Sequence, residues 1–395
     1  MWRPFLLVVI GCWALASAQT VVVLPFSNLS GTANLDWIGE SIAECARETL
    51  TSEGILVLDR ASREEAYRRL SLRASAPLTH ASVIKVGDLL DAERVVYGSF
   101  RVSPPPPDSA PDQKGSLEVS VRVLNLGQMT QSPEDSETAA LDNLVEVQDR
   151  LSWLVLQRLV APGRAPSREQ LHRPKPVRLD ALESYIRGLM AAAPEQKHRL
   201  FTQAARLDAG FSQPCFQLGQ LLWSGKNYKV AAGWLERVPA GAPNYTEASF
   251  LLGLCHYLLG EYDKAIASFR LVAESVPLNE VWNDLGAAQS RRNLPEAVES
   301  FRKAMGGDPN DSTYRFNLGY ALWKNGEFEA AADSFRAALD LTPVDPEATL
   351  MLGRCLKKTP AQQTEQRITG LERIKTNFEE MAYRQLRATL EKKRD

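Results

Sequence analysis

Residues 261–279 read EYDKAIASFRLVAESVPLN, with alanine at 265, phenylalanine four positions later at 269, and proline at 277. Related patterns return along the second half of the chain, where Leu-Gly pairs recur in steps of 33 or 34 residues. The pairs are Leu218-Gly219, Leu252-Gly253, Leu285-Gly286, Leu318-Gly319 and Leu352-Gly353. Self-similarity at this period is typical of stacked helix pairs.

Each recurring position has a packing reason. Glycine and alanine are expected where the two helices of a repeat come close, a bulky residue fills the space beside them, and proline ends the second helix. A shortened first repeat is marked by Gly188, Phe201 and Ala204. The repeats are therefore predicted at about 181–211, 212–245, 246–278, 279–311 and 312–345, with a partial repeat up to about 360. Polar capping helices are expected at 361–395.

The stretch 261–279 and the stretch EFEAAADSFRAALDLTP at 327–343 resemble tetratricopeptide repeats. The resemblance implies an all-α superhelix whose first helices line a concave groove for a protein or peptide partner. Carried over position by position, the groove residues are Phe216, Gln220, Trp223, Phe250, Leu254, Tyr257, Asn283, Arg291, Phe316, Tyr320, Trp323, Arg354, Lys357 and Lys358.

Such a groove would be aromatic over much of its length and basic at its C-terminal end. An exposed aromatic strip would suit an apolar or helical peptide, and the basic end an acidic segment. The alternative is that many of these side chains are buried between neighbouring repeats. The Lys-and-Asn set by which some relatives hold a peptide's terminal carboxylate is not apparent in the sequence.

Residues 19–160 predict an α/β domain of the order β-α-β-α-α-β-β-α. The strands are expected at 21–26, 55–58, 95–100 and about 117–123, and the helices at 35–50, 61–70, 80–91 and 139–160. The proline-rich residues 103–114 predict a hairpin loop. A second proline-rich stretch at 161–180 predicts a linker to the repeats.

The blocks VVVLPFSNLSG (21–31), LDWIGESIAE (35–44) and VVYGSF (95–100) resemble the bacterial TolB-like N-terminal domain. This resemblance implies a fold and an architecture but no activity. Asn28 and Asp36 follow the first strand, where α/β sheets tend to bind ligands. Their other interpretation is that they shape the turn and cap the helix.

The first 18 residues read as a secretory signal, because a short apolar run ends in Ala16-Ser17-Ala18. The competing interpretation is a lipobox ending at Cys12, which would make the chain a lipoprotein. Either route predicts an exported, periplasmic location, without a transmembrane span in the mature chain. Cys45, Cys215, Cys255 and Cys355 then remain, and their scatter along helices favours buried small side chains over disulfides.

The sequence contains no phosphate-binding, dinucleotide-binding, nucleophile-elbow or metal-ligand motif, and the acids Glu40 and Glu44 are expected on a solvated helix face. A net charge of −2 gives no basic field for nucleic acid. The leading hypothesis is a non-enzymatic, cofactor-free interaction scaffold of the cell envelope. The alternative is an envelope sensor or assembly factor whose N-terminal domain binds a small ligand or oligomerises. The sequence leaves the oligomeric state open.

Overall fold

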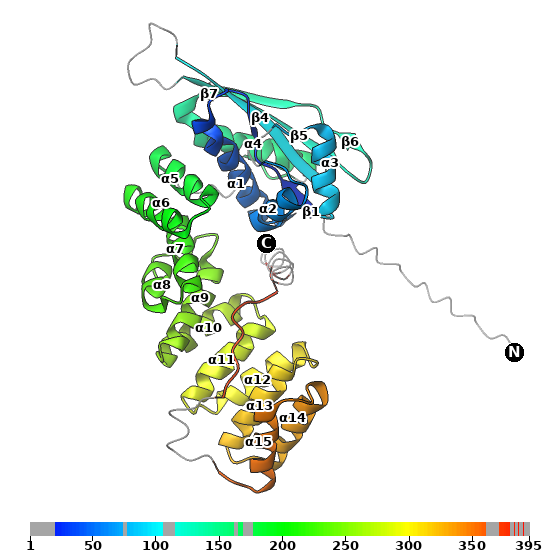
Figure 1. The fold of residues 1–395 in the computed structure, drawn as a ribbon, viewed down its shortest axis with the longest axis vertical. Coiled ribbons are helices and arrows are strands. Elements are labelled where there is room, and N and C mark those ends of the chain that lie inside the picture. Colours follow the sequence, from blue (N-terminus) through cyan, green and yellow to red (C-terminus); the bar gives the residue numbers. More distant parts are fainter. Residues whose placement is uncertain are drawn as a thin grey trace, which may run out of the picture. The chain divides into compact units, whose positions relative to one another are not determined.

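The computed structural model describes residues 20–73, 77–105, 115–161, 165–168, 177–360 and 371–379, together with residues 383, 386 and 390. The chain forms two compact units, one of residues 1–139 and 147–171 and the other of residues 140–146 and 172–395. Figure 1 shows a sheet with helices in the first and a run of paired helices in the second. The predicted signal sequence and lipobox, and most of the linker, lie outside the described residues.

The first unit is built on a mixed sheet. Strand β1 (Thr20–Val23) pairs in parallel with β3 (Leu56–Val57) and β4 (Arg94–Ser103). Strand β4 then pairs antiparallel with β5 (Ser116–Asn125) from Arg94↔Asn125 to Ser103↔Ser116, which confirms the predicted hairpin. The short strands β2 (Ser27–Asn28), β6 (Thr130–Gln131) and β7 (Asp135–Ala140) complete the sheet and were not predicted.

Helices cover both faces of this sheet. The side chains of β1 and β4 alternate between the faces, so Val22 and Val95 share a core with α2 (Arg60–Arg69) and α3 (His80–Leu89). Helix α1 (Asp36–Ser52) lies on the other face, where Gly39 contacts Phe26 and Phe100. Helix α4 (Leu144–Leu159) is joined to α1 by a hydrogen bond that Gln148 donates to Ser41, at 2.7 Å.

The second unit is a series of helix pairs that follow the predicted repeats. Within residues 177–360 the pairs are α5 (Leu179–Met190) with α6 (Pro194–Leu207), α7 (Gln213–Ser224) with α8 (Tyr228–Leu235), α9 (Tyr245–Leu258) with α10 (Tyr262–Ser275), α11 (Asn279–Arg291) with α12 (Glu296–Gly307), and α13 (Ser312–Lys324) with α14 (Phe328–Leu341). Helix α15 (Pro346–Leu356) follows them.

The repeat glycines lie where the two helices of a pair touch. A Cβ placed on Gly253 would come within 2.7 Å of the Phe269 ring, and one on Gly286 within 2.8 Å of Phe301. Real side-chain carbons do not approach so closely, so these positions admit glycine alone unless the ring moves. Gly353 on α15 has nothing within 4 Å of the same point. The close helix approach that the sequence period predicts is therefore present at Gly253 and Gly286.

Residues 371–379, called the tail segment below, correct one expectation. The charge pattern predicted capping helices at 361–395, but the tail segment contains no helix or strand. Figure 1 shows it as a thin red stretch that runs along the helix pairs. Its backbone groups are bonded by side chains of α11 and α13 rather than by each other. Residues 383, 386 and 390 are helical, and the remaining residues of 361–395 lie outside the described ones.

Candidate functional site

Three buried polar side chains hold the backbone of the tail segment. Asn317 of α13 donates from Nδ2 to the carbonyl of Arg373 at 2.7 Å and accepts the N–H of the same residue on Oδ1 at 2.8 Å. Asn283 of α11 donates to the same carbonyl at 2.8 Å, and Asp284 accepts the N–H of Lys375 at 2.8 Å. We call Asn283, Asp284 and Asn317 the clamp. Its bonds go to main-chain groups, so it can hold an extended chain of any sequence.

The clamp residues are themselves fully buried, and their polar atoms need partners there. Asn317 also donates to Oδ1 of Asn283 at 2.8 Å, which ties the two helices together. Burial raises the pKa of Asp284 well above its usual value, although the N–H of Lys375 partly offsets this. Leaving a buried amide or carboxylate unpaired costs about 1–3 kcal/mol or more, and the backbone of the tail segment supplies the partners that avoid this cost.

The carboxylate of Glu372 enters a cationic pocket. It accepts a hydrogen bond from the Ser290 hydroxyl at 2.7 Å, and its oxygens lie 3.6 Å from Lys324 Nζ and 3.8 Å from Arg291 Nη1. The Glu372 side chain has no exposed surface. Burial lowers the pKa of Lys324, and the charge of Glu372 works against that shift. This pocket therefore fits an acidic side chain.

The next residue of the tail segment enters an anionic pocket. The guanidinium of Arg373 donates to both carboxylate oxygens of Asp345, at 2.7 and 2.9 Å, and to Glu347 at 2.8 Å. Its carbon lies 3.6 Å from the centroid of the Phe316 ring, a cation–π contact. The hydrogen bonds from Arg373 hold the pKa of Asp345 below its usual value. Two bidentate-capable acids and an aromatic face are a combination that arginine satisfies and lysine does not.

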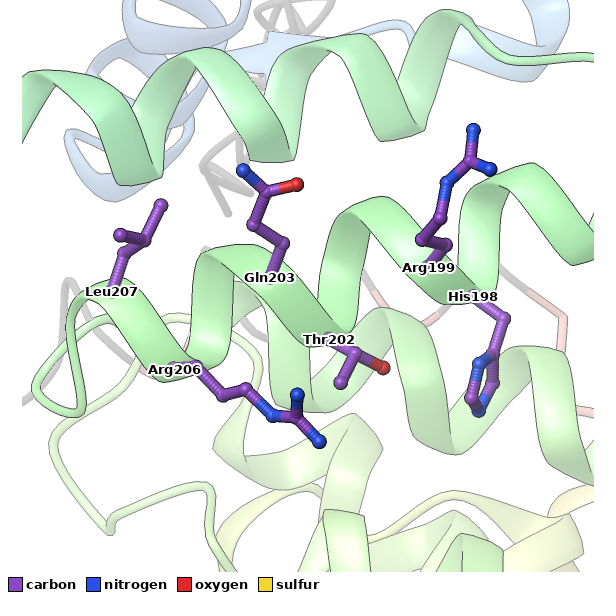
Figure 2. Close-up of a pocket in the computed structure, with 6 residues that line it drawn as sticks. All are labelled: His198, Arg199, Thr202, Gln203, Arg206 and Leu207. Atoms are coloured by element: carbon purple, nitrogen blue, oxygen red, sulfur yellow. The ribbon is translucent and has the colours of Figure 1, made fainter.

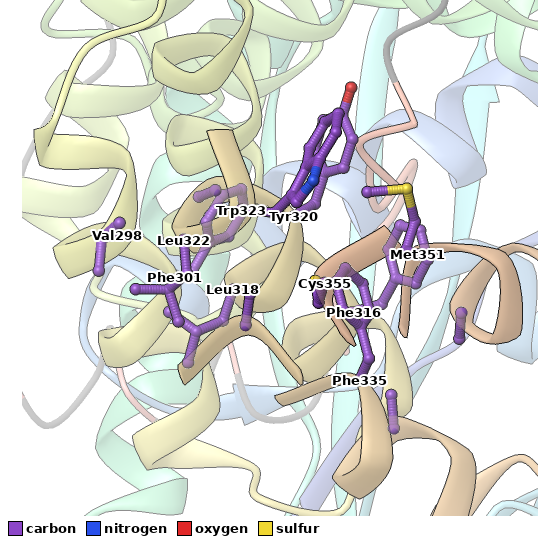
Figure 3. Packing of buried hydrophobic residues seen from close by; sticks show 14 of the residues in the cluster. Val298, Phe301, Phe316, Leu318, Tyr320, Leu322, Trp323, Phe335, Met351 and Cys355 are labelled. Carbon is purple, nitrogen blue, oxygen red and sulfur yellow. The ribbon is translucent and has the colours of Figure 1, made fainter. Parts of the chain in front are cut away.

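Apolar and basic side chains complete the fit. Ile374 packs against the clusters that contain Phe316 and Phe250, and the Phe378 ring lies 5.1 Å from that of Phe250. The amino group of Lys375 lies 2.5 Å from Asp311 Oδ2. Figure 3 shows Phe316 near Met351 and Cys355, with Tyr320 and Trp323 farther along α13.

The residues predicted for the groove fall into three groups. Phe250, Asn283, Arg291 and Phe316 contact the tail segment directly. A second group lies in the surrounding clusters or borders on them; it comprises Leu254, Tyr257, Tyr320, Trp323 and Arg354. Trp223 belongs to this second group as well, since it borders both the Phe250 cluster and the cluster around α7. The third group lies away from these contacts and comprises Phe216, which packs around α7, together with the exposed Gln220, Lys357 and Lys358.

The expected exposed aromatic strip is absent from these described helices. Phe250, Phe316, Tyr320 and Trp323 are 3% exposed or less, because neighbouring repeats and the tail segment cover them. Burial also raises the pKa of Tyr320 to about 12. The basic C-terminal end is a surface feature, since Lys357 and Lys358 point to solvent. In place of the strip, the structure has a polar clamp flanked by charged pockets.

Several residues of this site were not predicted. They are Asp284, Ser290, Asp311, Tyr314, Asn317, Lys324, Asp345 and Glu347. Position-by-position transfer from the family favoured aromatic residues and passed over them. One signal was available: Asn283 stands three residues before its repeat glycine, where Phe216, Phe250 and Phe316 stand in other repeats. A polar residue in an apolar column indicates a buried partner.

In the N-terminal unit, the polar candidates serve the fold. Asn28 donates to the Asp36 carboxylate at 2.8 Å and to the Thr32 carbonyl at 2.9 Å, and accepts from the Ser30 N–H at 2.9 Å. Every polar atom of its side chain is thus used inside the loop, which favours the turn-shaping interpretation.

Glu40 and Glu44 correct a second expectation. They are 5% and 6% exposed rather than solvated, because α2 packs its arginines against α1. Glu40 is paired with Arg63 and accepts from Arg60 Nε at 2.7 Å. The arginines outweigh the effect of burial and keep the pKa of Glu40 below its usual value. A carboxylate whose charge is balanced in this way forms a structural ion pair and is not suited to act as a general acid.

A further hollow of about 560 Å³ lies along α6. Figure 2 shows the side chains that line it, with Arg199 and Gln203 on one side of the helix and His198, Thr202 and Arg206 on the other. Among the described residues, no group of three metal-ligating side chains occurs, and no helix is long and apolar enough to cross a bilayer. Cys45, Cys215, Cys255 and Cys355 are free thiols in the structure.

Comparison with known proteins places the repeats in a family. The tetratricopeptide repeat model matches residues 216–280, 287–346 and 316–356. The peroxisomal targeting signal receptor of Kluyveromyces lactis is 33% identical over 101 residues, which are 25% of this chain and 18% of that protein. The human cell division cycle protein 16 homolog is 26% identical over 174 residues, 41% of this chain and 28% of that protein. The chain thus spans less than a third of these curated relatives.

Solved structures show similar helix arrays. YrrB, described as a tetratricopeptide repeat protein with an unusual peptide-binding site, has 19% identity and a TM-score of 0.42, over 44% of this chain and 92% of its own. MamA from Desulfovibrio magneticus has 24% identity and a TM-score of 0.37, over 40% and 92%. With the sheet of the first unit and the matched helix pairs of the second, the chain is a tetratricopeptide repeat protein with an N-terminal α/β region.

Proposed function

We propose that this chain is an exported, non-enzymatic adaptor of the bacterial cell envelope, whose repeats bind an extended segment of a partner protein. The observation that carries the proposal is the clamp, which makes four hydrogen bonds to the main chain of the tail segment. Side chains that bind main-chain groups from a helix surface are suited to peptides, since an extended peptide leaves its own N–H and C=O groups free. The TolB-like resemblance and the signal-like N-terminus support the envelope location.

A relative's name agrees with this reading. The peroxisomal targeting signal receptor is, by its name, a receptor for a targeting signal, and 101 residues of it align with this chain. We infer by analogy that the repeats of this chain also receive a segment of another protein.

The test is affinity capture from a native envelope with the full chain, in two variants. Asn317→Ala removes the side chain that bonds both backbone groups of Arg373. Arg336→Ala, a change at a half-exposed side chain of α14, is the matched control. We expect a set of proteins that is recovered with the wild type and the control and lost with Asn317→Ala, both variants giving the wild-type circular dichroism spectrum. Recovery of the same proteins with all three would show that the clamp is not the working surface.

The envelope location has its own readout in the same preparation. The intact mass of the chain purified from the envelope should correspond to a protein that begins at Gln19. A diacylated chain that begins at Cys12 would show that the protein is processed as a lipoprotein instead. A full-length chain in the cytoplasm would overturn export.

A further inference from the structure

We propose that the groove selects segments with the order acidic, arginine, aliphatic, basic, and that the tail segment is a tethered ligand of this class that a partner must displace. Residues 372–375 read Glu-Arg-Ile-Lys and present that order. The inference rests on the proposed peptide-binding function and names the chemistry of the peptide.

The backbone contacts and the side-chain contacts do different work here. Hydrogen bonds from Asn283 and Asn317 to the Arg373 carbonyl, and from the Lys375 N–H to Asp284, fix an extended path but read no sequence. Selection must come from the pockets on either side of that path. Each consecutive side chain from 372 to 375 has its own pocket, so a four-residue pattern is read.

The pockets along the path are in turn cationic, anionic, apolar and anionic. Glu372 faces Lys324 and Arg291, and Arg373 faces Asp345 and Glu347. Ile374 then packs on apolar clusters, and Lys375 faces Asp311. A segment with the first two charges exchanged would put an arginine against Lys324 and a carboxylate against Asp345. Like charges brought together out of water reject a wrong ligand more strongly than a neutral mismatch does.

The tail segment has the properties of a bound ligand rather than of a core element. It has no secondary structure of its own, and its C-terminal part exposes Thr376, Asn377 and Glu379. Its hydrogen bonds reach residues 26 to 99 positions away in sequence, on several different helices. The helix pairs pack on one another, and the tail segment adds Ile374 and Phe378 to the edges of their clusters.

A tethered ligand sets a threshold for other ligands. A segment joined to its own groove is present at an effective concentration on the order of millimolar. A free peptide that binds the groove with the same intrinsic affinity must exceed that concentration to replace the tail segment. Partners that bind weakly or briefly are excluded, and those with the full four-residue pattern or additional contacts are accepted.

The experiment measures binding of a fluorescein-labelled peptide with the sequence of residues 370–379 to the full chain, by anisotropy. Arg373→Ala weakens the tethered copy, because it removes the bonds to Asp345 and Glu347. Glu372→Gln weakens it at a different pocket and guards against a single misfolded variant. Asn377→Ala, an exposed position of the same segment, is the matched control.

We expect the peptide to bind the Arg373→Ala and Glu372→Gln chains at least tenfold more tightly than the wild type and the Asn377→Ala chain. Peptides with the first two charges exchanged, or with arginine replaced by alanine, should bind the Arg373→Ala chain at least tenfold more weakly than the original. Equal binding to all four chains would show that the tail segment does not occupy the groove. Equal binding of the three peptides would show that the groove does not read the pattern.

The outcome is separable from that of the proposed function. Partners lost on Asn317→Ala, together with failure of the peptide to bind the Arg373→Ala chain, would overturn the ligand class and leave the adaptor function. If the peptide binds but no partner depends on the clamp, the ligand class is supported and the adaptor function is overturned. Release of the tail segment on dilution of the protein, measured by amide exchange of residues 371–379, would show a segment contributed by a second copy and overturn the tether.

Discussion

Glu40 in the N-terminal unit and Glu372 in the tail segment are both buried carboxylates that face two cationic side chains, but different structures hold them. Glu40 lies on α1, and its partners Arg60 and Arg63 come from the neighbouring helix α2. Glu372 lies on a segment without secondary structure, and its partners Lys324 and Arg291 belong to two different repeats.

The difference shows what makes an ion pair part of a core. Both members of the Glu40–Arg63 pair are fixed by packed helices, and Arg63 also donates to the carbonyl of Val23 in β1 at 3.1 Å. To break it, the sheet and helices of the unit must separate. The Glu372 pocket can open when nine residues leave and water replaces them. The same chemistry is thus structural in one unit and exchangeable in the other.

The largest effect is expected at the fixed pair. Arg63→Ala leaves Glu40 buried with Arg60 as its remaining cationic partner, and removal of one member of a buried pair costs about 3–5 kcal/mol. Amide exchange of β1 and β4 should accelerate by roughly two to three orders of magnitude, while exchange in α9 to α14 stays as in the wild type. The measurement is hydrogen exchange with peptide-level mass spectrometry.

Arg68→Ala is the matched control, because Arg68 on the same helix pairs with Glu65 at the surface and is 78% exposed. Exposed pairs contribute about 0–1 kcal/mol, so exchange of β1 should change less than about tenfold. A similar small effect for Arg63→Ala would mean that Glu40 is held by other contacts and would end the comparison with Glu372.

Two glycines of the repeats allow a similar comparison, between a position fixed by packing and an open one. Gly253→Ala would place a methyl group 2.7 Å from the buried Phe269 ring and should destabilise the repeats by about 1–3 kcal/mol. Gly353→Ala meets nothing within 4 Å and should be neutral or stabilising by up to about 1 kcal/mol, since alanine favours helix. Thermal unfolding of both variants measures this. Equal effects would contradict the close approach of α9 and α10.

Much of the repeat fold could be predicted because its cause is local and recurrent. The glycine at each close approach and the bulky residue beside it stand at a fixed spacing, so the helix pairs follow from the period. In the N-terminal unit, β1 and β5 were predictable from apolar runs and alternation. The strands β6 and β7 were not, because their side chains are mostly polar and their positions depend on pairing with β5.

The tail segment shows where sequence reasoning failed. The many Lys, Arg and Glu residues of 361–395 indicated polar capping helices. The clamp outweighs that local preference, because Asn317 offers both a donor and an acceptor to one residue of the segment. Contacts between residues more than 50 positions apart carry no local signal. Only Asn283, a polar residue in an otherwise apolar column, hinted at them.

The smallest effect is expected from pH, on binding of the labelled peptide to the Arg373→Ala chain. Hydrogen bonds from an arginine lower the pKa of Asp345 from its usual 3.8. At Asp311, burial works upward, but the bond from a lysine and the Thr313 N–H lower its pKa overall. A lowered pKa in the bound state stabilises binding above about pH 3.8, and the contribution is lost as the pH falls through the bound-state values.

Asp284 acts in the opposite direction. Its pKa is raised by burial, and its Oδ1 can accept the lysine N–H of the ligand in either protonation state. Binding should therefore hold or strengthen as the pH falls from 7 towards 4, and weaken below about 3.8, provided that circular dichroism shows an intact fold. Asp284→Asn should remove the change in peptide affinity between pH 7 and 4. Asp345→Asn should reduce the loss of affinity below about pH 3.8. A loss of affinity that begins near neutral pH would contradict these assignments, because Asp345 and Asp311 have lowered pKa values and keep their charge in that range.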